Sequence, residues 1–94
     1  MIDENALVMA HQAHKQVTLT YMKEKTGEIV THTGGIYEIG TNKLGKPVVW
    51  LWDTFANDNI RQFIIANIQN LQVLDVDFQD VFGWGFKMNG TIIP

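Results

Sequence analysis

The stretch PVVWLWD, residues 47–53, is apolar on both faces if it forms a β-strand. Alternate side chains of a strand point the same way, so Trp50 and Trp52 share one face while Val49 and Leu51 share the other. Such a strand is typical of the centre of a sheet that is covered on both sides. We expect the amino-terminal helix or the aromatic-rich tail to cover the tryptophans. If that cover is incomplete, the tryptophan left showing becomes a contact site.

Length and composition favour one globular domain over residues 1–94. The sequence is 46% hydrophobic and 18% charged and contains no cysteine, so disulfide-stapled, thiolate and cysteine-metal functions are excluded. We expect a cytoplasmic protein that does not enter a membrane, because no apolar run approaches the roughly 20 residues that span a bilayer. The formal charge of −3 argues against a broad nucleic-acid footprint, although five lysines in the first half favour that part for an anionic ligand.

Hydrophobic spacing divides the chain into a helix, a run of strands and a tail. Apolar residues recur at helical spacing over residues 3–16, and Asp3 is placed to cap this helix. Alternating and β-branched patterns then predict strands over residues 17–22, 28–39, 47–54 and 60–66, with a short fifth strand over residues 71–74. Gly34 and Gly35 interrupt the second run, which indicates a bulge or a sharp bend.

These elements predict a mainly β (α+β) fold. We expect an amino-terminal helix followed by four or five antiparallel strands, residues 17–74, in a strongly bent small barrel of the SH3 or Sm type. A carboxy-terminal extension follows over residues 75–94. In it, Phe78 and Phe82 are spaced for a helical turn, and Asn89-Gly90 between two apolar runs predicts a hairpin.

The order of these elements resembles the WYL domain, a small Sm-like barrel common in bacterial and phage regulators. The resemblance rests on Tyr21, Gly27, the triplet at residues 49–51, and an Arg61-x-Phe63 pattern that ends at Ile68. It covers roughly residues 5–75 and implies a sensing or regulatory module. Because the chain leaves no room for a neighbouring domain, the resemblance further implies a stand-alone module, and with it a host-interaction role in a phage or mobile element.

The sequence departs from the resemblance at two basic positions. Family members that bind nucleic acid or nucleotides usually carry further arginines where Glu28 and Asn67 stand here. Arg61 is therefore the one arginine left for such a ligand. On its strand it should point the same way as Phe63, and it is expected either to pair with Asp53 or Glu38 at the rim or to contact a ligand.

Neither a metal centre nor a catalytic site is predicted. His11 and His14 are spaced to face the same way on the helix, but a zinc site would need a further ligand such as His32 or Glu28. The chain offers no nucleophile–base pair of a usual kind. Its clustered carboxylates are expected in an exposed turn, where burial would not raise their pKa: Asp75, Asp77 and Asp80. We expect no enzyme and no cofactor.

Two functional hypotheses remain open. In the first, a regulatory module binds a nucleotide or nucleic acid through basic and aromatic residues, namely Arg61, Trp52, Trp50, Tyr21 and Lys23. In the second, the protein is an interaction module, either a homodimer or an inhibitor of a host protein, that uses Trp84, Phe82 and Phe86 in the extension. Trp50 is expected to be core or half-covered, and Trp52 to be the more exposed to a partner.

Overall fold

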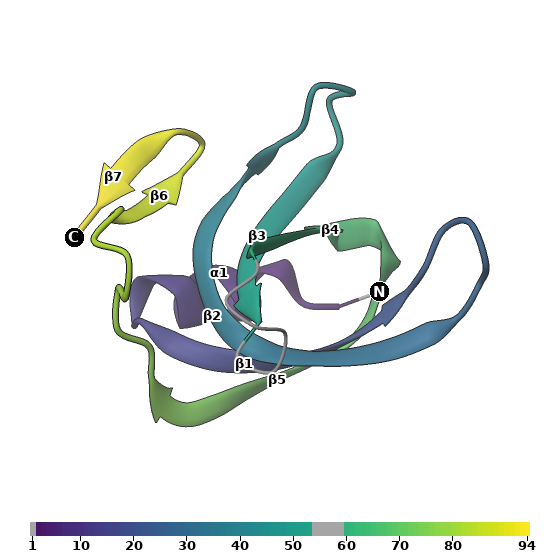
Figure 1. The fold of residues 1–94 in the computed structure, drawn as a ribbon, viewed down its shortest axis with the longest axis horizontal. Coiled ribbons are helices and arrows are strands. Elements are labelled where there is room, and N and C mark those ends of the chain that lie inside the picture. The colour runs from purple at the N-terminus through teal and green to yellow at the C-terminus, as the bar shows by residue number, and fades with distance from the viewer. Residues whose placement is uncertain (1, 54–59) are drawn as a thin grey trace.

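The computed structural model describes residues 2–53 and 60–94, which form one helix and seven strands (Figure 1). The elements are α1 (Glu4–Gln12), β1 (Lys15–Met22), β2 (Ile29–Thr41), β3 (Pro47–Asp53), β4 (Ile60–Ile64), a 3-10 turn (Ile65–Asn67), β5 (Ile68–Asp77), β6 (Phe86–Met88) and β7 (Thr91–Ile93). The expectation of a mainly β fold that begins with a helix is confirmed.

Helix α1 is shorter than predicted. Its start is as expected, because the Asp3 side chain accepts a hydrogen bond from the Asn5 N–H at 3.0 Å. It ends at Gln12 and not at residue 16, since His14 has a left-handed φ of 56° and Lys15 already begins β1. A residue in this conformation stops a helix.

The strands form one open sheet in the order β4-β3-β2-β1-β5. Strand β2 curves strongly, so that its first half pairs with β1 and its second half with β3 (Figure 1). The first three predicted strands match β1 to β3, although residue 54 lies outside the described residues. The predictions for the last two were inaccurate, because β4 ends at Ile64 and β5 extends over Ile68–Asp77, past the predicted end of the strand region.

The glycine pair in β2 serves close packing. A Cβ atom on Gly34 would lie 1.8 Å from the main-chain oxygen of Trp52, and one on Gly35 would lie 1.9 Å from the ring of Phe78. The register shift that marks a bulge falls just after the pair, between Ile36 and Glu38. The two glycines therefore let β3 and the carboxy-terminal extension approach β2 closely, and the bulge belongs to the residues that follow them.

Two hydrophobic clusters cover the two faces of β3, as the sequence predicts. Val49 and Leu51 point into the main core, which α1 closes from outside with Leu7 and Ala10. On the other face, Trp52 packs against a second, aromatic cluster: Tyr37, Phe78 and Phe86. Of the two covers considered for the tryptophan face, the structure uses the extension.

The carboxy-terminal extension differs from the prediction at its start and agrees with it at its end. The helical turn expected at Phe78 and Phe82 is wrong: residues 78–85 contain no helix, and the Phe78 N–H donates to the main-chain oxygen of His14 at 2.7 Å. The hairpin at Asn89-Gly90 is confirmed, with φ angles of 51° and 81° between β6 and β7. Strand β6 pairs with β2 in parallel.

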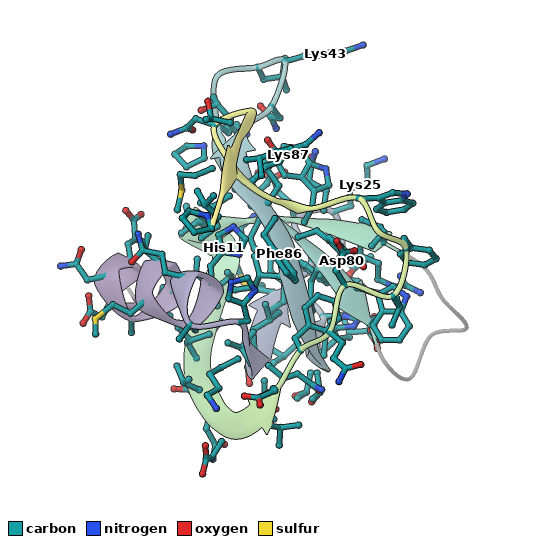
Figure 2. The ribbon with its side chains drawn as sticks, turned by 90° about the vertical axis from the view of Figure 1, so that its left-hand side faces the viewer. His11, Lys25, Lys43, Asp80, Phe86 and Lys87 are labelled. Carbon is teal, nitrogen blue, oxygen red and sulfur yellow. The ribbon has the colours of Figure 1, made fainter. Side chains whose placement is uncertain are left out.

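Two histidines fasten the extension to the rest of the fold. The Nε2 atom of His11, a buried side chain of α1, lies 2.7 Å from the main-chain oxygen of Lys87 (Figure 2). The Nε2 atom of His14 lies 2.9 Å from the main-chain oxygen of Pro94. Burial lowers the pKa of His11 below its ordinary value of 6.5, although its hydrogen bond to Lys87 opposes this shift. His11 therefore favours its neutral form, with Nε2–H donating.

Substituting Gly35 with alanine tests the close contact with Phe78. We expect Gly35→Ala to lower the free energy of unfolding by about 2–3 kcal/mol, because the new methyl group overlaps a ring that its neighbours hold in place. Urea denaturation measures this loss. In a Phe78→Ala background the same substitution should cost clearly less, and an equal cost in both backgrounds would contradict the contact.

The buried His11 predicts a pH-dependent loss of stability. Its pKa is lowered on folding, so the unfolded chain takes up the proton first and stability falls as the pH drops from about 6.5 toward the folded-state pKa. Urea denaturation at about pH 7.5 and about pH 5.5 should show a larger loss for the wild type than for His11→Gln. Equal losses in the two proteins would contradict this prediction, because they differ only at residue 11.

Candidate functional site

The extension and the outer face of β3 bring six aromatic side chains together. We call this group the aromatic surface: Tyr37, Trp52, Phe78, Phe82, Trp84 and Phe86. Within it, Phe82 and Trp84 stack with ring centroids 4.3 Å apart and an interplanar angle of 17°. These two rings are 39% and 53% exposed, whereas Tyr37, Phe78 and Phe86 are buried. The outer pair is thus a large apolar area presented to solvent on a packed base.

Asp80 fixes the loop that carries the exposed pair. Its carboxylate accepts hydrogen bonds from the Tyr37 hydroxyl at 3.0 Å, the Trp84 N–H at 3.1 Å and the Gly85 N–H at 2.6 Å. The Tyr37 hydroxyl in turn accepts from the Phe82 N–H at 3.3 Å. Desolvation alone would raise the pKa of Asp80, but the bonds from Gly85, Tyr37 and Trp84 outweigh it and lower the pKa.

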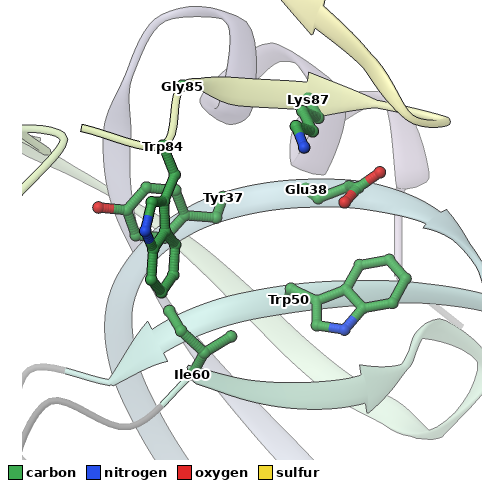
Figure 3. A pocket seen from close by; sticks show the side chains of 7 residues that line it. All are labelled: Tyr37, Glu38, Trp50, Ile60, Trp84, Gly85 and Lys87. Carbon is green, nitrogen blue, oxygen red and sulfur yellow. The ribbon is translucent and has the colours of Figure 1, made fainter. Parts of the chain in front are cut away.

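Next to this loop lies a pocket of about 210 Å³. Trp84 and Trp50 stand on opposite sides of it, and Ile60 of β4 lies below (Figure 3). The remaining lining residues are Tyr37 and Glu38 of β2, Gly85, and Lys87 of β6. The pocket therefore joins residues from four strands and the loop.

The bulge in β2 explains why two consecutive residues reach the same pocket. Ile36 and Ile39 both point into the main core, so the two residues between them, Tyr37 and Glu38, lie on the opposite side. Strict alternation would send one of them into the core. An extra residue in one strand places both side chains on the side of the sheet that carries the pocket.

Two side chains of opposite charge lie at one end of the pocket. Glu38 Oε2 accepts a hydrogen bond from the Gly90 N–H at 2.9 Å, which fixes the carboxylate above Trp50 (Figure 3). Lys87 reaches from β6 toward Glu38 (Figure 3). Its ammonium makes no ion pair with a carboxylate in the part of the chain that the structure describes. The other end, at Tyr37, Trp84 and Ile60, is aromatic and apolar.

The expectation that Trp50 is core or half-covered is confirmed, whereas the expectation that Trp52 is the more exposed to a partner conflicts with its packing against the extension. Both are half-buried, but the Trp52 ring stacks on Phe78 with an interplanar angle of 26°, and its indole Nε1 is buried without a hydrogen-bond partner. Trp50 borders the pocket. The physical reason is that the extension crosses β3 at Trp52 and leaves Trp50 beside the loop.

Arg61 does not join the tryptophans. In the register of β3 and β4 it lies opposite Leu51, whereas Trp50 and Trp52 lie opposite Gln62 and Ile60. The arginine is thus on the core-side face of β4 together with Phe63, as predicted, but it is exposed. It is not ion-paired with any carboxylate of residues 2–53 or 60–94.

The predicted pairing of Arg61 with Asp53 or Glu38 is wrong, because both acids are directed elsewhere. Asp53 Oδ2 lies 2.6 Å from His32 Nδ1. Glu38 binds the Gly90 N–H. Both carboxylates thus belong to contacts that hold strands and hairpin in place.

The other two predicted ligand residues have structural contacts. The Tyr21 hydroxyl accepts a hydrogen bond from the Ile64 N–H at 3.1 Å, and its ring meets Phe63 edge-on at 4.9 Å. Lys23 forms an ion pair with Glu28 at 3.2 Å beside the turn between β1 and β2. The structure therefore does not gather Arg61, Trp52, Trp50, Tyr21 and Lys23 into one site.

The predicted interaction residues divide in a similar way. Trp84 and Phe82 are exposed, as an interaction surface requires, whereas Phe86 is only 9% exposed and stacks on Tyr37 with an interplanar angle of 21°. Sequence reasoning missed Tyr37, Glu38, Ile60 and Lys87. Tyr37, Glu38 and Lys87 meet through the bulge and the parallel pairing of β6, and Ile60 arrives with β4. The glycine pair indicates a bulge but not which side chains it turns, and the parallel pairing has no local sequence signal.

The remaining candidates for chemistry are separated. His11 and His14 bind main-chain oxygens, and His32 lies with Asp53. Among the described residues no three metal-ligating side chains form a group. Asp75 and Asp77 were predicted to lie in an exposed turn, and this is wrong. Both lie in β5, where both contact Lys15.

The lysines of the first half do not form a single basic patch. Lys15, Lys23 and Lys46 each lie within 4.0 Å of a carboxylate oxygen, while Lys25 and Lys43 extend from separate turns (Figure 2). The carboxylates beside Lys15, Lys23 and Lys46 reduce the local potential that a phosphate backbone would meet.

Asp80 offers a test of the loop. We expect Asp80→Ala to lower the free energy of unfolding by about 2 kcal/mol, because three donors lose a charged acceptor. Urea denaturation measures the loss, and acrylamide should quench tryptophan emission more strongly as Trp84 is released. Asp75→Ala is the control, because its side chain is fully exposed. Equal stability of the two variants would contradict the role of Asp80.

Comparisons with known proteins give no relative: no family model, no curated protein and no solved structure matches the chain. In the described residues, no helix is both long and apolar enough to cross a membrane.

Proposed function

We propose that the protein is a non-enzymatic interaction module that binds a polypeptide partner at the pocket between Trp50 and Trp84 and over the neighbouring Phe82. One observation carries this proposal: a stacked pair of exposed aromatic rings borders a pocket and is held by a hydrogen-bonded loop. Aromatic side chains that are held in place by a hydrogen-bonded loop are suited to binding, because little conformational entropy is lost when a partner covers them.

The surroundings of the pocket support binding rather than catalysis. Its titratable residues are Tyr37, Glu38 and Lys87, and the first two already make structural hydrogen bonds. Beside them stand rings and aliphatic groups, which offer contact area. Such a mixture, an apolar centre with a few polar groups at one end, is typical of recognition sites.

A nucleotide or nucleic acid is the second candidate ligand. Two tryptophans on opposite sides of a pocket, with Lys87 beside them, are suited to stacking a base near a phosphate. We rank this ligand second because the formal charge is −3 and Arg61 lies on the other face of β4.

At the level of the fold, we propose a small barrel of the SH3 or Sm type and a stand-alone WYL-like regulatory role. The strand order, the bend of β2 and the 3-10 turn between β4 and β5 support the barrel. The WYL-like pattern of Tyr21, Arg61 and Phe63 supports the family, and with it a regulatory role such as inhibition of a host protein by a phage or mobile element.

Selection from a random peptide library displayed on phage tests the function. We expect the wild type to enrich peptides that bind with a dissociation constant of about 1–100 μM and that lose at least about tenfold in affinity to Trp84→Ala. Arg61→Ala is the matched control, because it removes an exposed side chain from the other face. Peptides that bind both variants equally would contradict the proposed surface.

Two further measurements separate the alternative partners. Light scattering should show a monomer at micromolar concentration, and a dimer that Trp84→Ala dissociates would identify a second copy of the chain as the partner. Single-stranded oligonucleotides at low salt should bind weakly or not at all. Tight binding that Arg61→Ala weakens would favour the nucleic-acid ligand instead.

A further inference from the structure

We propose that the side chain anchoring the partner in this pocket is basic, an arginine or a lysine including its methylated forms. Its cationic group would lie between Trp50 and Trp84, next to the carboxylate of Glu38. This inference rests on the proposed function and specifies the chemistry of its partner. Four features support it: the size of the pocket, its rings, its carboxylate and the charge of the whole chain.

The size of the pocket suits one side chain. Its volume of about 210 Å³ is below the range of about 300–1,000 Å³ that is usual for sites of drug-sized ligands. A whole nucleotide would therefore extend well outside it. A single long side chain of a bound polypeptide can enter while the rest of the partner stays on the exposed Phe82–Trp84 pair.

The rings of the pocket favour a cation. Three of the lining side chains are aromatic, and the faces of tryptophan and tyrosine attract positive charge. Trp84 has Phe82 stacked on one of its faces. Trp50 makes no ring contact with another aromatic side chain of the described residues, so its indole is open to an incoming group.

Glu38 supplies a negative charge at a defined place. The Gly90 N–H holds one of its oxygens at 2.9 Å, and the carboxylate has no lysine or arginine partner in the residues that the structure describes. A cation that enters above Trp50 can pair with this carboxylate and contact the Trp50 ring at the same time. Charge-assisted contacts of this kind are stronger than neutral ones. The formal charge of −3 also favours approach of a basic partner.

Lys87 opposes the proposed ligand and thereby provides the sharpest test. Its side chain is half-buried and reaches toward Glu38, so it must turn away when another cation arrives. Removing its charge should therefore strengthen binding of a basic ligand, whereas removing the charge of Glu38 should weaken it. An anionic ligand would respond to both substitutions in the opposite sense.

The test uses short capped peptides with glycines on each side of one variable residue. That residue is trimethyl-lysine, lysine, arginine, norleucine or glutamate, and binding is followed by the indole N–H signals of Trp50 and Trp84 in NMR titrations. We expect the basic peptides to bind at least about fivefold more tightly than the norleucine peptide. Glu38→Gln keeps an acceptor for Gly90 and should weaken the basic peptides about fivefold. Lys87→Gln should tighten them by about the same factor.

Two control variants change the net charge equally at a distance from the pocket. Glu24→Gln and Lys25→Gln lie in the exposed turn between β1 and β2 and should leave every affinity unchanged within about twofold. The inference is overturned if norleucine binds as well as the basic residues, if the glutamate peptide binds best, or if no basic peptide shifts the indole signals at up to about 10 mM.

These outcomes are distinct from failure of the proposed function. Peptides selected from the random library could bind the wild type and lose affinity to Trp84→Ala while containing no basic residue that Glu38→Gln affects. In that case the surface binds polypeptides, and only the basic anchor is wrong. If no library peptide binds and the short basic peptides do not bind either, both are wrong.

Discussion

Burial of strand β3 on both faces is the constraint on which the rest of the structure depends. A single small sheet with one helix can cover one face of this strand, and α1 does so with Leu7 and Ala10. The other face presents Trp52, whose exposure would leave a large apolar ring in water. The extension supplies the missing cover with the buried Phe78 and Phe86. The second aromatic cluster is thus needed to complete the fold, and the aromatic surface is built on it.

The approach of the extension imposes a series of local requirements. Phe78 can reach β2 only because Gly35 has no side chain, and β2 can reach β3 only because Gly34 has none. Immediately afterwards the bulge turns Tyr37 toward the extension, where its hydroxyl and Asp80 organise the loop. The same bulge turns Glu38 toward Trp50. Fold and candidate site therefore share one short segment of β2, so substitutions there will affect stability and binding together.

Much of the fold can be predicted from the sequence, because its strongest signals are local. The cap at Asp3, the alternation in β1, the apolar run of β3 and the Asn89-Gly90 turn each act within a few residues. The end of α1 and the length of β5 were inaccurately predicted, since a left-handed His14 and pairing with β1 decide them. The site was predicted less well. Trp84 and Phe82 were found by composition, but Tyr37, Glu38 and Lys87 meet through a bulge and a parallel strand pairing between distant segments.

The exposed pair of rings is hard to explain by stability alone. Phe82 and Trp84 stack on each other and still leave 39% and 53% of their surfaces in water, whereas Asp80, Gly83 and Gly85 are arranged to hold them there. A loop that only covered Trp52 would need Phe78 and Phe86, both of which are already buried. Fixing two further large rings at the rim of a pocket adds ordering cost and aggregation risk without completing the core. A binding function explains this arrangement. Because the loop is ordered before the partner arrives, less conformational entropy is lost when the partner covers the two rings.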